Sequence, residues 1–254
     1  MILANVRKVF SDIKVICQKI DRDPNGITVV GVTKMVALDA VQEAIDAGIR
    51  HIAENRVQEA ENKFPLLKAQ NPHLECHIIG HLQTNKAKDA IAVSSLIQSV
   101  DSLKLAQEIE KQAVKRNKIP CHSERKIRCH SERSEESQQD KAVKILVQFN
   151  TAYEEQKFGA DPKDAHTLIE AISRLSFVRI KGLMCMAPFT EDQGIIRKTF
   201  SGLRDIRDGI KIRFNGHPHV DIGILSMGMS SDYKIAIEEG STMVRVGSAI
   251  FKKD

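Results

Sequence analysis

Apolar and polar residues along this chain follow two alternating periods. Short continuous apolar runs, typical of strands buried on both faces, are separated by stretches in which apolar residues recur every three or four positions, typical of amphipathic helices. A helix is predicted before the first run from Val6, Val9, Ile13 and Ile16. The apolar runs lie at residues 27–32, 50–53, 75–79, 96–100, 143–149, 178–183, 220–225 and 243–246.

The order of these elements predicts the fold class. About eight strand-then-helix units in strict alternation indicate parallel strands, which favours a barrel over a doubly wound open sheet. The length of 254 residues is close to the roughly 250 residues typical of one (β/α)8 barrel. We therefore expect an α/β protein in which residues 1–254 form a single TIM barrel with an additional N-terminal helix.

One stretch, at about residues 118–140, does not fit this alternation. It is polar, and the sequence Cys-His-Ser-Glu-Arg at 121–125 recurs at 129–133. Two Cys-His pairs could in principle bind zinc, but neighbouring side chains do not easily converge on one ion and none of the usual zinc spacings is present. We interpret the stretch as a duplicated surface-loop insertion and predict no metal site.

Composition and charge narrow the class of protein. Apolar residues make up 42% of the chain and charged residues 28%, and no apolar run approaches the roughly 18 residues of a membrane helix. The five scattered cysteines fit reduced thiols, and the first residues lack the pattern of a secretory signal. We expect a cytoplasmic protein without a membrane partner. A net charge of +5 is too small to indicate nucleic-acid binding.

Two short segments near the C-terminus have the composition of phosphate-binding loops. Ser226-Met227-Gly228-Met229-Ser230 offers hydroxyls and an unhindered glycine amide before a predicted helix, and Gly247-Ser248 follows the last strand. Free N–H groups at such turns bind anions. Between them, Arg245 interrupts an apolar strand, where an arginine is costly unless it meets an acceptor. Ordinary glycine turns and a structural salt bridge are the alternative interpretation.

Lys34 ends the first apolar strand, at the edge where a parallel α/β protein carries its chemistry. A surface charge is the default for one such lysine. Its combination with a phosphate site and a strand arginine changes the picture, because pyridoxal phosphate requires a Schiff-base lysine, a phosphate site and a partner for its ring nitrogen.

Three further residues at strand exits could line a pocket, and each has another explanation. Asn55 could be a helix N-cap, His77 a hydrogen-bonded core histidine, and Met184 a packing residue. Their shared position at strand exits is the reason to retain them as candidates.

Several segments together resemble one family over nearly the whole chain. They are VTK at Lys34, IAENRVQE at Asn55, HIIGHLQTNK from His77, KFG at Lys157, GLMCMAP from Gly182, LSMGMSSD from Leu225 and GSTMVRVGSAIF from Gly240. In this order they are similar to the YggS/PROSC-type pyridoxal phosphate homeostasis proteins. Ala53 and Lys252, where the family usually has glycine, and Met35-Val36 depart from the pattern without removing a ligand residue.

The resemblance implies a barrel of the alanine racemase N-terminal-domain type, with pyridoxal 5'-phosphate held as a covalent aldimine on Lys34. It maps the ring-nitrogen contact to Arg245 and the pocket lining to Asn55, His77 and Met184. The implied phosphate contacts are Ser226, Gly228, Met229, Ser230, Gly247 and Ser248.

The same resemblance implies a role in intracellular pyridoxal phosphate homeostasis, in which a monomer buffers the cofactor and passes it to apo-enzymes, affecting amino-acid and keto-acid balance. The alternative is an enzyme such as an amino-acid racemase. We favour a non-catalytic carrier because racemases of this fold need a second acid/base, usually from a further C-terminal domain, and the chain ends after the last barrel strand. We expect neither of its two tyrosines, Tyr153 and Tyr233, to replace that group. Arginine on the ring nitrogen also weakens the electron sink. A Schiff-base aldolase would need a partner beside Lys34 that the sequence does not identify.

Overall fold

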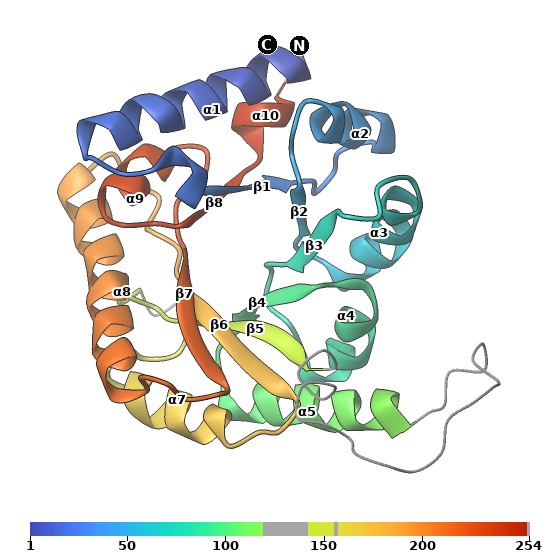
Figure 1. Cartoon of the computed structure of the whole chain (residues 1–254), viewed down its shortest axis with the longest axis vertical. Coiled ribbons are helices and arrows are strands. Elements are labelled where there is room, and N and C mark those ends of the chain that lie inside the picture. Colours follow the sequence, from blue (N-terminus) through green and yellow to red (C-terminus); the bar gives the residue numbers. More distant parts are fainter. Residues whose placement is uncertain (119–141, 155–156, 253–254) are drawn as a thin grey trace.

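The computed structural model describes residues 1–118, 142–154 and 157–252, and shows eight parallel strands closed into a barrel with helices around it (Figure 1). Each strand pairs with its neighbours in sequence, and β8 closes the ring against β1. The strands are β1 (Thr28–Val32), β2 (His51–Glu54), β3 (Glu75–Ile78), β4 (Leu96–Val100), β5 (Val143–Gln148), β6 (Val178–Met184), β7 (Val220–Ser226) and β8 (Met243–Val246). The predicted fold class and all eight predicted strands are confirmed.

Helices follow the strands and cover the outside of the barrel. They are α2 (Leu38–Asp46), α3 (Val57–Gln70), α4 (Ala87–Val93), α5 (Leu103–Lys118), α7 (Ala165–Ser173), α8 (Gln193–Arg213), α9 (Tyr233–Glu238) and α10 (Ser248–Phe251). Short 3-10 turns lie at η1 (Pro24–Gly26), η2 (Thr84–Lys86) and η3 (Pro162–Asp164).

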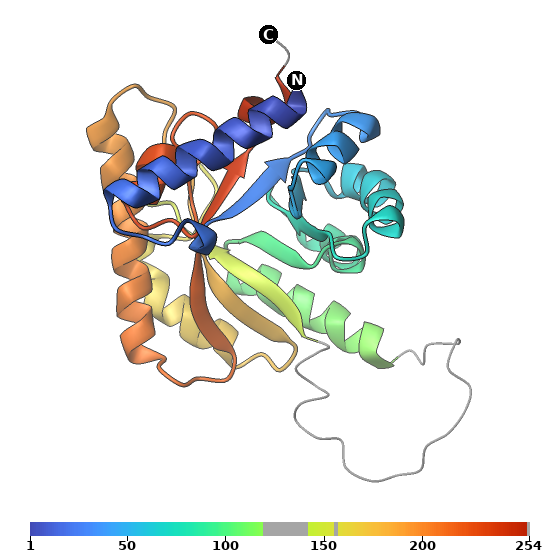
Figure 2. The same ribbon diagram turned by 45° about the horizontal axis from the view of Figure 1, so that its top comes forward.

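The predicted N-terminal helix is α1 (Ile2–Lys19), which crosses α9 and α10 on the side where β8 meets β1 (Figure 2). All four residues that predicted it are buried. Asp12 on the same helix accepts a hydrogen bond from the Tyr233 hydroxyl at 2.9 Å, and Asn5 donates to the Ile250 carbonyl at 3.0 Å. The helix therefore fastens the two C-terminal helices to the barrel.

Strand residues alternate between an outer apolar layer and the barrel interior, because successive side chains in a strand point to opposite faces. The interior cluster is separate from the layer under the helices. Its buried members are Val30, Ala53, Leu96, Leu146, Met184 and Met243. Ala53, one departure from the family pattern, thus contributes its methyl group to this packing.

The polar insertion predicted at about 118–140 falls between α5 and β5, and residues 119–141 lie outside the described part of the chain. Both Cys-His pairs lie there. Cys17, Cys76 and Cys185 are free and buried. Among the described helices, none combines the length and the apolar character needed to cross a bilayer.

Candidate functional site

The candidate residues come from several strands whose carboxyl ends meet at one end of the barrel. Val30 points inward, so Val32 shares its face by the two-residue period of a strand. Lys34 lies just beyond β1 and is exposed. Arg245 on β8 is paired with Val30 in the sheet register, so it lies deeper in the barrel than Lys34, which follows the end of β1.

The backbone just before Lys34 is held by a buried ion pair. Glu54 at the end of β2 is fully buried and faces α3, where its Oε1 lies 2.8 Å from Lys63 Nζ. The same oxygen accepts from Thr33 Oγ1 at 2.7 Å, and Lys63 also donates to the Thr33 carbonyl at 2.8 Å. Burial raises the pKa of Glu54, against the opposing effect of Lys63 and Thr33. The end of β1 is thereby fixed from outside the barrel.

Asn55 follows β2 and is exposed, and the N-cap position of α3 is taken by Arg56. The Asn55 backbone lies against Gly80, where an added Cβ would come within 2.2 Å of the Asn55 carbonyl oxygen. Only glycine permits this approach of the loops after β2 and β3. Because Arg56 takes the N-cap position of α3, the N-cap alternative for Asn55 is wrong. The contact of Asn55 with a ligand stays a prediction.

Arg245 is paired with Val30 of the interior cluster in the sheet register, and only 3% of its surface is exposed. Its Nη1 donates to Ser226 Oγ at 2.7 Å, and its Nη2 donates to the Cys185 carbonyl at 2.8 Å. In the described part of the chain no carboxylate lies within ion-pair distance of it. Burial lowers its pKa, while Cys185 and Asp232 oppose the shift. The salt-bridge alternative for this arginine is therefore not supported.

Ser226 and His77 belong to one polar row inside the barrel. Ser226 donates to Gln98 Oε1 at 2.6 Å, Gln98 Nε2 lies 2.7 Å from His77 Nδ1, and His77 Nε2 lies 3.2 Å from His51 Nδ1. Burial, with the neighbouring His51, lowers the pKa of His77 to about 3, so this imidazole is neutral. Ser226 lies next to Arg245, below the loop that contains the other expected phosphate contacts.

The two C-terminal loops meet through Ser230. Its Oγ accepts from the backbone N–H groups of Gly247 at 3.1 Å and of Ala249 at 3.2 Å. Two amides converging on one oxygen is also the arrangement that a phosphate oxygen requires. Gly228 has a φ of +95°, and a Cβ there would lie 2.6 Å from the Cβ of Ala236. The turn therefore depends on glycine.

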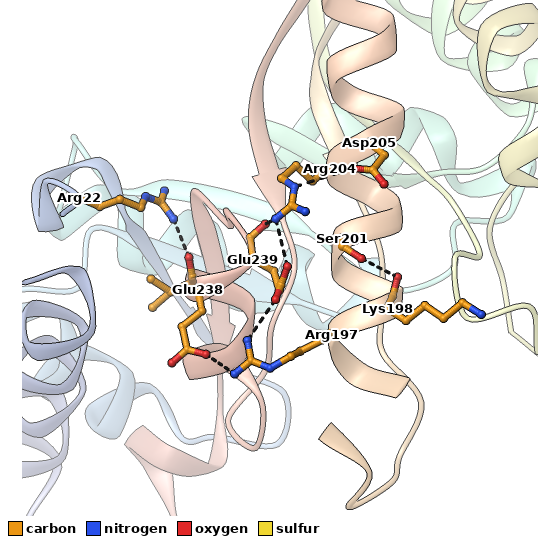
Figure 3. A network of polar contacts seen from close by, with 9 residues as sticks. Arg22, Arg197, Lys198, Ser201, Arg204, Asp205, Glu238 and Glu239 are labelled. Atoms are coloured by element: carbon orange, nitrogen blue, oxygen red, sulfur yellow. Dashed lines mark hydrogen bonds and ion pairs between the residues drawn. The ribbon is translucent and has the colours of Figure 1, made fainter. Parts of the chain in front are cut away.

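Ion pairs on the outside of the barrel hold the helix behind this loop (Figure 3). Arg197 on α8 contacts Glu238 and Glu239 at the end of α9, and Arg204 contacts Glu239 at 3.0 Å. Arg22, beyond α1, donates to the Ile237 carbonyl at 2.7 Å. These contacts anchor α9 at its C-terminal end, and so the Gly228 loop at its other end.

The sequence placed the remaining candidates at strand ends but did not show how deeply each one lies inside the barrel. Met184 is fully buried in the interior cluster, whereas Met229 is exposed on the loop after β7 and Ser248 is exposed at the start of α10. It missed Gln98, Glu54 and Lys63. Gln98 in the apolar run 96–100 was the available signal, because a buried glutamine needs hydrogen-bond partners.

Known proteins share this architecture over the whole chain. The family described as "Alanine racemase, N-terminal domain" matches residues 11–254. A pyridoxal phosphate homeostasis protein of Aquifex aeolicus is 35% identical, with 96% of this chain and 94% of the relative covered. One from Pseudomonas aeruginosa is 32% identical, with 98% and 94% covered.

Solved structures of other proteins have the same fold. PipY of Synechococcus elongatus with pyridoxal phosphate bound superposes with a TM-score of 0.77 at 28% identity, covering 99% of this chain and all of PipY. An alanine racemase of Clostridium difficile, at 16% identity and a TM-score of 0.70, covers 99% of this chain and 60% of its own, and shows the fold alone. The chain therefore belongs to the family of pyridoxal phosphate homeostasis proteins, which are built on the alanine racemase N-terminal domain.

Proposed function

We propose that this protein binds pyridoxal 5'-phosphate through a covalent Schiff base on Lys34, and that it buffers and hands on the cofactor without catalysing a reaction. The observation that carries the proposal is Arg245, a buried guanidinium inside the barrel that is held by neutral acceptors. Such a group suits the lone pair of an unprotonated pyridine nitrogen. The pyridoxal phosphate bound by PipY, a relative of the same fold, supports the assignment.

Each part of the site has a separate role in this proposal. Lys34 would supply the amine that condenses with the aldehyde and releases water, Arg245 would donate to the ring nitrogen, and the amides near Ser230 and Gly247 would hold the phosphate. Asn55 and Met184 would line the ring. The bound cofactor supplies a reactive aldehyde and an electron-withdrawing ring.

Two arguments disfavour a racemase. An arginine that donates to the ring nitrogen keeps it unprotonated, which weakens the electron sink. The hydroxyl of Tyr233 is bound to Asp12 on α1, outside the barrel, and burial together with Asp12 raises its pKa. The Tyr233 hydroxyl is therefore held outside the barrel and keeps its proton, so it cannot act as a base there.

Borohydride trapping tests the binding site directly. Protein incubated with pyridoxal phosphate and reduced with borohydride should carry one pyridoxyl adduct on Lys34 by peptide mass spectrometry. Lys34→Ala should lose the adduct and the visible absorption, whereas Lys86→Ala, which changes another lysine beyond a strand end, should keep both. An adduct confined to Lys86 or Lys234 would refute the assignment, and turnover of L-alanine to D-alanine would refute the non-catalytic role.

Delivery to apo-enzymes, a monomeric state and a cytoplasmic location belong to the same proposal. The three cysteines of the described residues are buried free thiols, which is consistent with a reducing compartment. Cofactor-loaded protein should reactivate an apo-aminotransferase faster than the same free concentration of pyridoxal phosphate does. Equal rates would mean that the protein only stores the cofactor.

A further inference from the structure

A row of hydrogen bonds runs through the barrel interior with every donor pointing the same way. Arg245 donates to Ser226, and Ser226 donates to Gln98 Oε1. The Gln98 amide nitrogen is then a donor to His77 Nδ1, as it also is to Met243 Sδ at 3.3 Å. His77 therefore carries its proton on Nε2 and donates to His51 Nδ1. Four different strands, β8, β7, β4 and β3, supply the donors, and β2 supplies the last acceptor.

The hydrogen bonds of this row cannot be reversed so that each donor becomes an acceptor. If the Gln98 amide were reversed, its NH2 group would face Ser226 Oγ, which already accepts from Arg245. The Ser226 proton would then have no acceptor among the contacts of the described residues, and an unsatisfied buried hydroxyl is costly. Because Arg245 is a donor only, it sets the direction of every bond behind it.

The same row compensates the buried charge of Arg245. Each group presents its electronegative end toward the guanidinium, and so does the carbonyl of Cys185, the residue that follows β6. Within the described residues this replaces the carboxylate that a buried arginine usually needs. Two of the five guanidinium N–H groups are used in this way, and the side chain is held in one orientation.

We propose that Gln98, acting with Ser226 and His77, is a positioning residue that fixes Arg245 to recognise an unprotonated aromatic ring nitrogen. This inference rests on the proposed binding of pyridoxal phosphate. It extends that function by making selectivity for the ring nitrogen depend on a residue of β4 that contacts Arg245 only through Ser226.

The test compares pyridoxal phosphate with its analogue in which C–H replaces the ring nitrogen. The wild-type protein should bind pyridoxal phosphate roughly tenfold or more tightly than the analogue, as expected for one charged hydrogen bond. Gln98→Leu should reduce this preference to about threefold or less. Gln98→Glu, which keeps an acceptor for Ser226, should retain it.

Gln148→Leu is the matched control, since Gln148 is also a buried glutamine but on β5, where it donates to the Phe158 carbonyl. It should leave the preference unchanged whatever it does to absolute affinity. An equal loss of affinity for both ligands in Gln98→Leu would overturn the inference, because it would show a purely structural role.

Nitrogen-15 NMR of the histidines tests the row without any cofactor. In the wild-type protein, His77 should be protonated on Nε2 and unprotonated on Nδ1. In Gln98→Leu, His77 should no longer be held in this single tautomer. His77 protonated on Nδ1 in the wild-type protein would overturn the inference. Failure of the protein to bind pyridoxal phosphate at all, with the predicted tautomer present, would instead refute the proposed function.

Discussion

Removing the Lys63 cation should make the stability of this protein strongly pH-dependent. Lys63→Met leaves Glu54 fully buried, bound only to Thr33 and without its counterion. A buried carboxylate without a partner neutralises itself by taking up a proton. In the unfolded chain Glu54 has its ordinary pKa of 4.5. At any pH above this value the variant must take up a proton on Glu54 in order to fold, and this lowers its free energy of unfolding.

The cost follows from the pH difference. It is about 1.4 kcal/mol for each pH unit above 4.5, hence at most about 3.4 kcal/mol at pH 7 and about 0.7 kcal/mol at pH 5. The lost bond from Lys63 to the Thr33 carbonyl adds about 1 kcal/mol at both pH values. Because the pKa of Glu54 is higher in the folded variant than in the unfolded chain, the variant has its full stability below the unfolded pKa. It loses this stability as the pH rises through the folded pKa.

Urea unfolding of the cofactor-free protein at pH 5 and pH 7 measures this difference. Lys63→Met should lose about 2 kcal/mol at pH 5 and about 4 kcal/mol at pH 7, relative to wild type. Adding Glu54→Gln should remove the pH dependence, and Lys68→Met, an exposed lysine on the same helix, should change little. The same loss at both pH values would refute the reasoning, since it would exclude a proton on Glu54.

Three further predictions concern the loops. Gly80→Ala should destabilise the protein by about 1–3 kcal/mol and weaken pyridoxal phosphate binding, because its Cβ overlaps the Asn55 carbonyl; an unchanged melting temperature would contradict this. Gly228→Ala, at positive φ and against Ala236, should reduce affinity for pyridoxal phosphate more than for pyridoxal, which lacks the phosphate; equal losses by titration would argue against a phosphate contact there. Deletion of residues 118–140, of which 119–140 lie outside the described part, should leave pyridoxal phosphate binding intact, since a loop's closure entropy changes by only about 0.6 kcal/mol per twofold change in length. A large fall in melting temperature would instead favour a metal clip formed by Cys121, His122, Cys129 and His130.

The elements and the barrel were predictable from the sequence because their signals are local or depend on order alone. A strand buried on both faces must be continuously apolar, and a covering helix must be apolar every three or four residues. Strict alternation then leaves few topologies. The glycine-rich loops after β7 and β8, and Lys34 after β1, were recognisable for the same reason.

The polar interior was decided by the tertiary structure, because its residues are far apart in the chain. Ser226 and Gln98 are 128 positions apart and bond only because the closed barrel brings β7 and β4 to one axis. Whether a strand residue points inward, and at what depth, depends on register, which apolar runs do not encode. For this reason the sequence could indicate that Arg245 needed an acceptor, while the fold determined that Ser226 and the Cys185 carbonyl supply it.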